Sequence, residues 1–215
     1  MIKLPLAEKP HFVFQGEGRY TGQKMLLLRV QGCSLNCSFC DSKYTWKMPE
    51  KDQWIAVDEL INDMEVDQIM ITGGQPSLYP EQIADFVSTY DDVIRFHIED
   101  DGSYNWTDHF DKYYNVYFAF SPKRDEKGLL QFATFNYSLD CDIKIVVKDA
   151  SEVLEIAVWA EYFGISRKRI YIMPEGQTRK QILWTASFIA EKALELGFNF
   201  TLRNHIMLYD DKRMV

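Results

Sequence analysis

The sequence lacks any long hydrophobic run. Its apolar stretches, such as Met25 to Val30, are far shorter than the roughly 20 residues that a membrane-spanning helix needs. The first residues, Met-Ile-Lys-Leu-Pro, contain no hydrophobic region of the kind found in signal peptides. We therefore expect a cytoplasmic protein that does not enter a membrane.

Positive charge is also scarce. The chain has 24 Lys and Arg against 32 Asp and Glu, which gives a formal net charge of -8. Proteins that bind nucleic acid without sequence preference use clustered Lys and Arg to neutralise phosphates, and this balance excludes that class. A small-molecule substrate fits the composition better.

Low-complexity tracts, linkers rich in Pro, Gly or Ser, and internal repeats are all missing, so nothing marks a domain boundary. The 215 residues, 47% of them hydrophobic, are enough for one domain with a substantial core. We expect a single domain over residues 1–215.

Cysteines are few, but three of the four lie within eight residues. Because no secretory signal is present, a metal or cluster explains Cys33, Cys37 and Cys40 better than disulfides do. The remaining Cys141 lies in an apolar run and is expected to be a buried structural thiol.

Short runs rich in β-branched and aromatic residues alternate with helical patterns. The expected strands are Met25–Val30, Ile69–Thr72, Val93–Glu99, Asn115–Phe120, Asp142–Val147 and Arg169–Met173. Apolar residues at helical spacing occur from Ile55 to Met64, Ile83 to Val87 and Val153 to Ala160, and a further helix is expected from about Arg179 to Leu196, ended by Gly197. Repeated βα units predict an α/β fold with a parallel sheet, as an open or partial barrel.

Parallel strands of such a fold present their ligand-binding residues at their C-terminal ends. Four motifs fall there: Gln31-Gly32-Cys33 after the first expected strand, Gly73-Gly74 after the second, Glu99 at the end of the third and Ser121-Pro122-Lys123 after the fourth. We expect them to line one site.

The segment Cys33-Ser-Leu-Asn-Cys37-Ser-Phe-Cys40 places three thiolates in one loop. Three thiolates can bind three irons of a [4Fe-4S] cluster and leave the fourth iron open to a small ligand, whereas a structural zinc site has four protein ligands. The spacing favours the cluster, with zinc or a redox thiol loop as the alternative.

These motifs resemble those of the 7-carboxy-7-deazaguanine synthase family of the radical S-adenosylmethionine (SAM) superfamily. The resemblance rests on the cysteine motif and on further segments in the same order along the chain: Phe14-Gln-Gly-Glu-Gly18, Leu28-Arg-Val-Gln-Gly-Cys33, Cys40-Asp-Ser-Lys-Tyr-Thr-Trp46, Thr72-Gly-Gly-Gln-Pro76, Ser121-Pro-Lys123, Lys144-Ile-Val-Val147, Met173-Pro-Glu-Gly176, Arg203-Asn-His205 and Arg213-Met-Val215. It implies a partial (β/α)6-type radical SAM barrel, reduced in helices.

The resemblance also implies the cofactors, which are a [4Fe-4S] cluster on Cys33, Cys37 and Cys40, and SAM. No catalytic residue beyond the cofactor ligands is expected. The residues it assigns to SAM are Phe39, Gly73, Gly74, Gln75, Glu99, Asp101, Ser121, Lys123, Met173, Pro174 and Glu175. Two of them depart from the family pattern, since Gln75 replaces a Glu and Asp101 replaces an Asn.

The implied reaction is the radical ring contraction of 6-carboxy-5,6,7,8-tetrahydropterin to 7-carboxy-7-deazaguanine with loss of ammonia, in 7-deazapurine (queuosine-type) biosynthesis. The residues assigned to the pterin are Phe14, Gln15, Glu17, Arg29, Thr72, His205 and Val215. Glu17 would accept from the guanidine-like edge of the pterin, and Arg29 would bind its carboxylate. The hydroxyl of Ser42 would help to hold a Mg2+.

A homodimer and an electron donor such as flavodoxin or ferredoxin are further implications of the family. Two other functions stay open at this point. One is a glycyl-radical activating enzyme, which uses the same cysteine spacing on a protein partner. The other is a diverged, non-catalytic iron-sulfur homologue, which the departures at Gln75 and Asp101 would permit.

Overall fold

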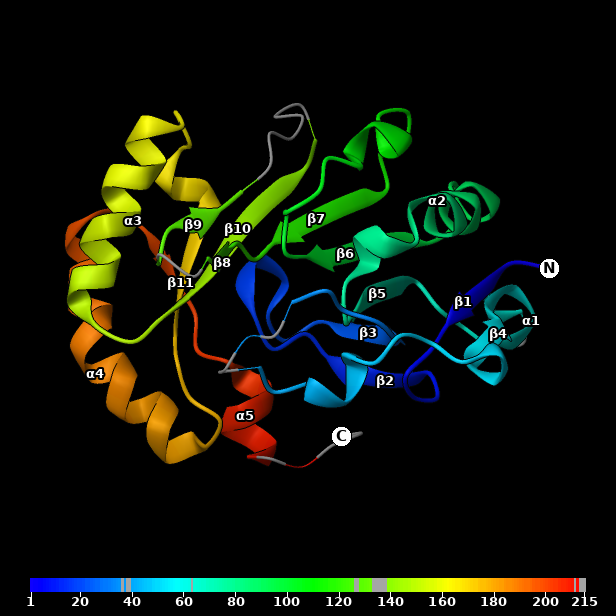
Figure 1. Cartoon of the computed structure of the whole chain (residues 1–215), viewed down its shortest axis with the longest axis horizontal. Coiled ribbons are helices and arrows are strands. Elements are labelled where there is room, and N and C mark those ends of the chain that lie inside the picture. The colour runs from blue at the N-terminus through cyan, green and yellow to red at the C-terminus, as the bar shows by residue number, and fades with distance from the viewer. Residues whose placement is uncertain are drawn as a thin grey trace. The chain divides into compact units, whose positions relative to one another are not determined.

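The structure is a computed structural model of the whole chain, and it describes all residues except 36, 38, 39, 63, 126, 127, 133–138, 211 and 213–215 (Figure 1). The chain forms two compact units. Unit 1 contains Met1–Val13 and Lys24–Cys141, and unit 2 contains Phe14–Gln23 and Asp142–Val215.

Unit 1 is built on neighbouring strands in the order β7-β6-β5-β3-β2. The strands are β2 (His11–Phe14, whose last residue belongs to unit 2), β3 (Lys24–Val30), β5 (Gln68–Gly73), β6 (Arg95–Asp100) and β7 (Val116–Phe120). β3, β5, β6 and β7 run parallel (Figure 1), and Leu28 lies opposite Ile71 and Ile71 opposite Ile98. Their C-terminal ends therefore lie at one edge.

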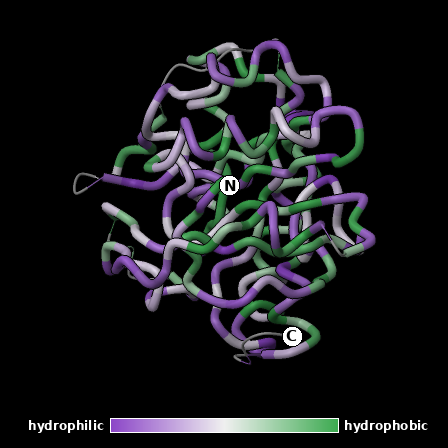
Figure 2. The backbone as a smooth tube through the Cα atoms, turned by 90° about the vertical axis from the view of Figure 1, so that its right-hand side faces the viewer, coloured by the Kyte–Doolittle hydropathy of each residue, from purple (hydrophilic) through white to green (hydrophobic). Residues whose placement is uncertain are grey.

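Continuous apolar runs explain why these segments are central strands. All five residues of β7 are buried, and so are Ile69, Met70 and Ile71 of β5. A strand that is covered on both faces lacks the alternation of polar and apolar residues that a half-exposed strand shows. Figure 2 shows such hydrophobic stretches as green segments of the tube.

The connections in unit 1 are poor in helix. Among the residues of unit 1 that the structure describes, α2 (Pro80–Thr89), between β5 and β6, is the one regular crossover helix; α1 (Val57–Ile61) has five residues. The other elements are the antiparallel pairs of β1 (Lys3–Pro5) with β4 (Trp54–Ala56) and of β8 (Lys123–Arg124) with β9 (Leu130–Gln131), and the 3-10 turns Lys43–Thr45, Lys51–Gln53, Pro76–Leu78 and Thr107–Phe110.

The helix expected from Ile55 to Met64 is shorter than predicted. Ile55 lies in β4 and pairs with Leu4, and the helix spans only Val57–Ile61. The predicted helical assignment of Ile55 was wrong because a distant segment, β1, supplies a strand partner that local spacing cannot reveal.

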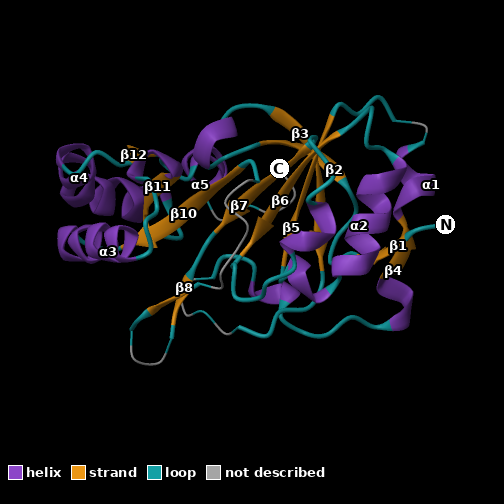
Figure 3. Ribbon diagram, turned by 90° about the horizontal axis from the view of Figure 1, so that it is seen from above, coloured by secondary structure: helices purple, strands orange, loops and turns teal. Residues whose placement is uncertain are grey.

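Unit 2 has three parallel strands in the order β12-β11-β10: β10 (Cys141–Val147, whose first residue belongs to unit 1), β11 (Ile170–Pro174) and β12 (Asn199–Phe200). The helices α3 (Ala150–Tyr162) and α4 (Arg179–Glu195) connect these strands and pack side by side (Figure 3). The last helix is α5 (Asn204–Tyr209), and 3-10 turns span Gly18–Tyr20 and Arg167–Arg169.

Local signals mark the start of α3 and the end of α4. The Asp149 side chain accepts hydrogen bonds from the backbone N–H groups of Ser151 and Glu152 at the start of α3. At the end of α4, Gly197 has φ +76°, and the N–H of Phe198 reaches back to the carbonyl of Ala193 at 3.0 Å. This is the Schellman arrangement that the glycine predicts.

The α/β class with a mostly parallel sheet is confirmed. All six expected strands lie in or overlap observed strands, although the third begins at Arg95 rather than Val93, and the short β1, β2, β4, β8, β9 and β12 were not predicted. Cys141 is buried, as expected. Among the described residues, no helix is long and apolar enough to cross a membrane. The single-domain organisation stays a prediction.

The buried His97 of β6 should make stability sensitive to acid. Its Nε2 lies 2.9 Å from Oε1 of Gln68. Burial, helped by the charge of Arg95 and opposed by that of Asp140, lowers the pKa of His97 to about 4. The unfolded chain takes up this proton near pH 6.5, so stability falls as the pH drops from 6.5 to 4, by at most ~3 kcal/mol.

We expect His97→Gln to reduce this acid loss by up to ~3 kcal/mol, as measured by urea unfolding at pH 7, 6, 5 and 4. The exposed His109 is the matched control, and His109→Gln should leave the pH dependence as it is. An unchanged acid slope in His97→Gln would contradict the assignment.

Candidate functional site

Four loops of unit 1 begin at the same edge of its strands. They start after Val30 of β3, Gly73 of β5, Asp100 of β6 and Phe120 of β7. Since these four strands are parallel neighbours, the loops emerge side by side, as the sequence predicted.

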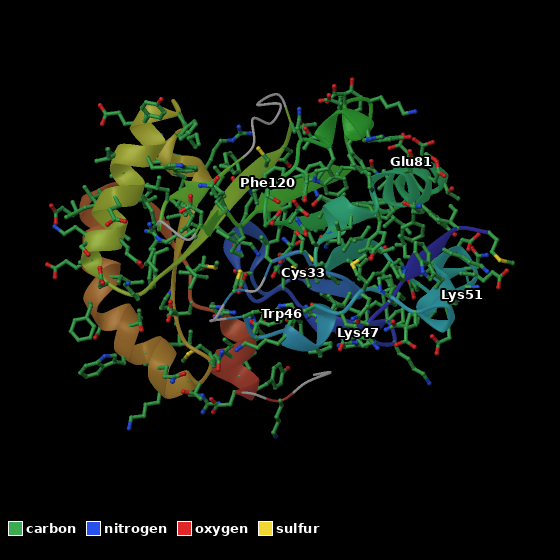
Figure 4. All side chains as sticks on the ribbon, viewed as in Figure 1. Cys33, Trp46, Lys47, Lys51, Glu81 and Phe120 are labelled. Atoms are coloured by element: carbon green, nitrogen blue, oxygen red, sulfur yellow. The ribbon has the colours of Figure 1, made fainter. Side chains whose placement is uncertain are left out.

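The loop after β3 carries the three thiols. Cys33, Cys37 and Cys40 are all partly exposed and unpaired by disulfides (Figure 4 labels Cys33). Burial raises the pKa of the Cys33 thiol, and the negative charges of Asp101, Cys37 and Cys40 raise it further. Two of the sulfurs accept hydrogen bonds from backbone N–H groups. Leu35 donates to Cys33 and Ser42 donates to Cys40, each at 3.4 Å.

These donors fit an iron-sulfur cluster. Backbone N–H bonds to thiolate sulfur are among the interactions that tune such clusters. Among the described residues no three Cys, His, Asp or Glu side chains converge closely enough to share one metal ion. A cubane does not require this, since each thiolate binds a different iron.

The two glycines at the end of β5, Gly73 and Gly74, are required by the packing of the protein itself. A Cβ on Gly74 would lie 2.0 Å from the carbonyl oxygen of Gly32, and one on Gly73 would lie 2.4 Å from that of Val30. Gly73 also has φ +129°, and the N–H of Gly74 donates to Val30 O at 2.9 Å. The close approach of β3 and its loop therefore demands glycine at both positions.

Gln75 connects two of the loops. Its Oε1 accepts from the backbone N–H and the hydroxyl of Ser34, at 3.1 and 2.7 Å, and its Nε2 donates to Oδ2 of Asp101 at 3.2 Å and to Oγ of Ser103 at 3.1 Å. Both Gln75 and Asp101 are buried. The two residues that depart from the family pattern thus form one hydrogen-bonded pair.

The neighbouring Asp100 was not predicted as a site residue, and its role is structural. Its carboxylate accepts from the N–H groups of Ser77 and Gly102 at 3.0 and 2.9 Å. Burial, together with the charge of Asp101, raises the pKa of Asp100 to about 6. The two accepted N–H groups join the turn after β5 to the turn after β6. Glu99, which precedes Asp100 on β6, is partly exposed.

Ser121 and Lys123 follow β7. Nζ of Lys123 donates to the carbonyl oxygen and the hydroxyl of Ser121, at 2.6 and 2.8 Å. Burial raises the pKa of Cys37, while the positive charge of Lys123 opposes this rise. The lysine charge therefore acts on the thiol loop.

Arg29 lies in a second polar group of unit 1. Its Nε donates to Oε1 of Glu8 at 2.8 Å, and its Nη1 donates to Oγ of Ser42 at 3.3 Å. Tyr44 donates to the other oxygen of Glu8 at 3.0 Å. Burial lowers the pKa of Arg29, but Tyr44 and Glu8 outweigh this and raise it overall. Thr72 is the register partner of Arg29 across β3 and β5.

One oxygen ligand lies beside Ser42, the residue that we predicted to bind Mg2+. Ser42 Oγ donates to Oδ1 of Asp41 at 2.9 Å, so two oxygens of the kind that Mg2+ prefers are adjacent. The guanidinium of Arg29 donates to the same hydroxyl, and a cation bound there would lie beside this positive charge. Mg2+ stays a prediction that rests on the resemblance.

In unit 2, Glu17 lies among cations. Its Oε2 lies 2.9 Å from Nζ of Lys144, and its Oε1 lies 3.0 Å from Nε of Arg203 and 4.0 Å from Nε2 of His205. Burial by itself raises the pKa of Glu17, but Lys144, Arg203 and His205 outweigh it and hold the pKa far below its usual range. Lys144 and Arg203 were seen in the motifs but were not assigned to the site.

The segment around Glu17 is held against the tail of unit 2. A Cβ on Gly16 would lie 2.5 Å from Nδ1 of His205, and the N–H of Asn204 donates to Gly16 O at 2.9 Å. Gln15 is buried and its Oε1 accepts from the N–H of Glu17 at 3.1 Å, whereas the side chain of Phe14 is exposed. The structure thus brings Gln15, Glu17 and His205 together.

Three of the residues assigned to SAM lie at the end of β11 or directly after it. Met173 and Pro174 end β11 and are buried, and the N–H of the partly exposed Glu175 donates to Val147 O at 2.8 Å. The side chain of Met173 belongs to the packed interior of unit 2. Phe39 and Val215 lie outside the described residues.

Residues 27–189 match the profile of the Radical SAM superfamily. A curated 7-carboxy-7-deazaguanine synthase from Hyperthermus butylicus is 30% identical over 208 residues, which cover 90% of this chain and 88% of the relative. The chain belongs to the 7-carboxy-7-deazaguanine synthase family of radical SAM proteins. A second relative of this name, from Pyrobaculum aerophilum, is 28% identical over 206 residues and covers 93% of this chain and 92% of its own.

Among solved structures, the crystal structure of QueE from Escherichia coli matches with a TM-score of 0.64 and 20% identity, over 94% of each chain. At this identity the match shows the radical SAM fold. Membership of the superfamily makes a [4Fe-4S] cluster and SAM the cofactors, and the chain's own donors fit the cluster.

Replacing the thiols tests the cluster site. We expect Cys33→Ala, Cys37→Ala and Cys40→Ala each to abolish the brown colour and broad visible absorbance of anaerobically reconstituted protein, because three irons need three thiolates. Cys141→Ala is the matched control and should retain the wild-type iron and sulfide content. Wild-type iron content in any of the first three variants would contradict the assignment.

Glu17 should contribute strongly to stability, since Lys144 and Arg203 are almost fully buried. Glu17→Gln leaves both cations without their carboxylate, and we expect it to lower the free energy of unfolding by ~3–5 kcal/mol. Glu191→Gln, on the exposed face of α4, is the control and should change it by less than ~0.5 kcal/mol. Urea unfolding at pH 7 measures both, and equal effects would disprove the role of the buried ion pairs.

Proposed function

We propose that this chain is a radical SAM lyase that converts 6-carboxy-5,6,7,8-tetrahydropterin to 7-carboxy-7-deazaguanine by radical ring contraction with loss of ammonia. The match with the Hyperthermus butylicus relative, over 90% of this chain and 88% of the relative, carries the substrate assignment. The superfamily profile alone does not, because it covers residues 27–189 and therefore neither the segment of Glu17 nor that of His205.

The cluster and SAM, when bound, supply the one-electron chemistry that produces a 5′-deoxyadenosyl radical. The protein's part is to hold them and the substrate. Cys33, Cys37 and Cys40 would bind the cluster, and Gly73, Asp101 and Lys123 would bind the amino-acid part of SAM. Phe39, Gly74, Gln75, Glu99, Ser121, Met173, Pro174 and Glu175 complete the proposed SAM residues.

For the pterin we propose two anchors. Arg29 binds the substrate carboxylate through its guanidinium, which Glu8 and Ser42 already orient in unit 1. Glu17 accepts from the guanidine-like edge of the pterin ring, and Lys144 and Arg203 keep it ionised for that purpose. Phe14, Gln15, Thr72, His205 and Val215 are the further proposed substrate residues, and Ser42 is the proposed Mg2+ ligand.

We also propose that the chain forms a homodimer and that a flavodoxin or ferredoxin reduces it. Its product would be used in queuosine-type biosynthesis. They rest on family membership. The acidic net charge of -8 agrees with a small-molecule substrate rather than nucleic acid.

The test is an anaerobic assay of reconstituted protein with SAM, reductant and 6-carboxytetrahydropterin, with and without added Mg2+. We expect 5′-deoxyadenosine and a product lighter by ammonia. Arg29→Lys cannot make a bidentate contact with the substrate carboxylate. We expect this variant to raise KM for the pterin at least ~10-fold while SAM binding is unchanged.

SAM cleavage without any pterin turnover would overturn this function and favour an activating enzyme that acts on a protein. Failure to bind SAM would favour a non-catalytic iron-sulfur protein. The two alternatives are thereby separated from each other as well as from the proposal.

A further inference from the structure

We infer that Arg19 and Asp142 form a positioning pair, which holds the segment that carries Glu17 in the place where Glu17 meets the pterin. Neither Arg19 nor Asp142 belongs to the proposed substrate residues. The inference rests on the proposed function, in which Glu17 accepts from the guanidine-like edge of the substrate. All three residues lie in unit 2.

The contact between Arg19 and Asp142 is bidentate. Nε of Arg19 donates to Oδ2 of Asp142 and Nη2 donates to Oδ1, each at 2.7 Å. The side chain of Asp142 is 1% exposed and that of Arg19 is 36% exposed. Two parallel charge-assisted hydrogen bonds fix orientation as well as distance. The pair therefore gives the segment around Arg19 one defined position on β10.

Glu17 is held on the same strand by a second ion pair. Nζ of Lys144 donates to Oε2 of Glu17 at 2.9 Å. Asp142 and Lys144 are two residues apart on β10, so they share one face of the strand. On the segment that covers this face, Glu17 and Arg19 flank Gly18, where an added Cβ would lie 3.2 Å from Cδ of Lys144. The segment thus lies directly on β10.

The order of charges on the two segments permits one pairing. The negative Glu17 meets the positive Lys144, and the positive Arg19 meets the negative Asp142. A shift that exchanged the partners would place Arg19 against Lys144, or Glu17 against Asp142, and like charges that face each other destabilise. Buried ion pairs are best attested as devices that fix register. The Arg19–Asp142 pair therefore selects the position of Glu17.

The backbone attaches the two halves of the segment differently. In the first half, the N–H of Asn204 donates to Gly16 O at 2.9 Å, which ties it to the start of α5. The second half folds back on the segment itself, since the N–H of Gly22 donates to Gln15 O at 2.8 Å. The side chain of Arg19 carries this second half onto β10.

The first experiment measures steady-state kinetics of anaerobically reconstituted protein. Arg19→Met removes the guanidinium, and Asp142→Asn keeps the shape of the side chain and removes its charge. We expect each variant to raise KM for the pterin at least ~10-fold, with kcat within ~3-fold of wild type and KM for SAM unchanged. The reason is that only the placement of the pterin anchor is altered.

The matched control is Arg95→Met. Nη2 of Arg95 lies 2.9 Å from Oδ2 of Asp140, and the side chain of Arg95 is 39% exposed, close to the value for Arg19. We expect Arg95→Met and Arg19→Met to lower the melting temperature by similar amounts. KM for the pterin should rise in Arg19→Met alone, and a merely structural role of Arg19 would leave it unchanged in both variants.

The second experiment needs no pterin. Hydrogen exchange, followed by mass spectrometry, reports how often the amides of a peptide that covers residues 14–23 open to solvent. We expect Arg19→Met to speed exchange in this peptide at least ~10-fold and to leave that of α4 unchanged. Arg95→Met should leave exchange in both segments as in wild type.

An unchanged KM for the pterin in Arg19→Met and Asp142→Asn, with an active wild type, would overturn the inference. Unchanged exchange of residues 14–23 in Arg19→Met would also overturn it. A wild-type protein that does not turn over the pterin would refute the proposed function instead. In that case faster exchange in Arg19→Met would still support a pair that positions the segment of Glu17.

Discussion

The close approach of the β5 end to the β3 end is the constraint on which the rest of unit 1 depends. Gly73 and Gly74 lie so near Val30 and Gly32 that no side chain fits at either position. This contact brings the thiol loop beside the turn that carries Gln75, and Gln75 then reaches the turn after β6. The site is thus assembled by backbone packing and completed by one buried amide.

Buried charge is handled differently in the two units. In unit 2, Glu17 is surrounded by cations that keep it ionised despite its burial. In unit 1, two consecutive carboxylates are buried; Asp100 is neutralised more easily because burial raises its pKa to about 6, while Asp101 receives three hydrogen-bond donors. Such arrangements are costly unless every charge is compensated, and they mark the segments where we place the ligands.

Much of the fold could be read from the sequence, because its signals are local. Apolar runs predicted the six main strands, Gly197 predicted the end of α4, and the cysteine spacing with its flanking motifs led to the family that the relatives confirm. The short strands escaped prediction, as did the place of Ile55 in β4, because their partners are distant in sequence.

The sequence by itself determined the chemistry that is available: three thiols in one loop, glycines after a strand, and ionisable residues at the strand ends. Only the tertiary structure decided which of these groups interact. It gave Arg29 a partner in Glu8 and Glu17 partners in Lys144 and Arg203, and it paired Gln75 with Asp101, 26 residues away. Periodicity describes a residue's own element, whereas ion pairs and hydrogen bonds depend on which elements meet.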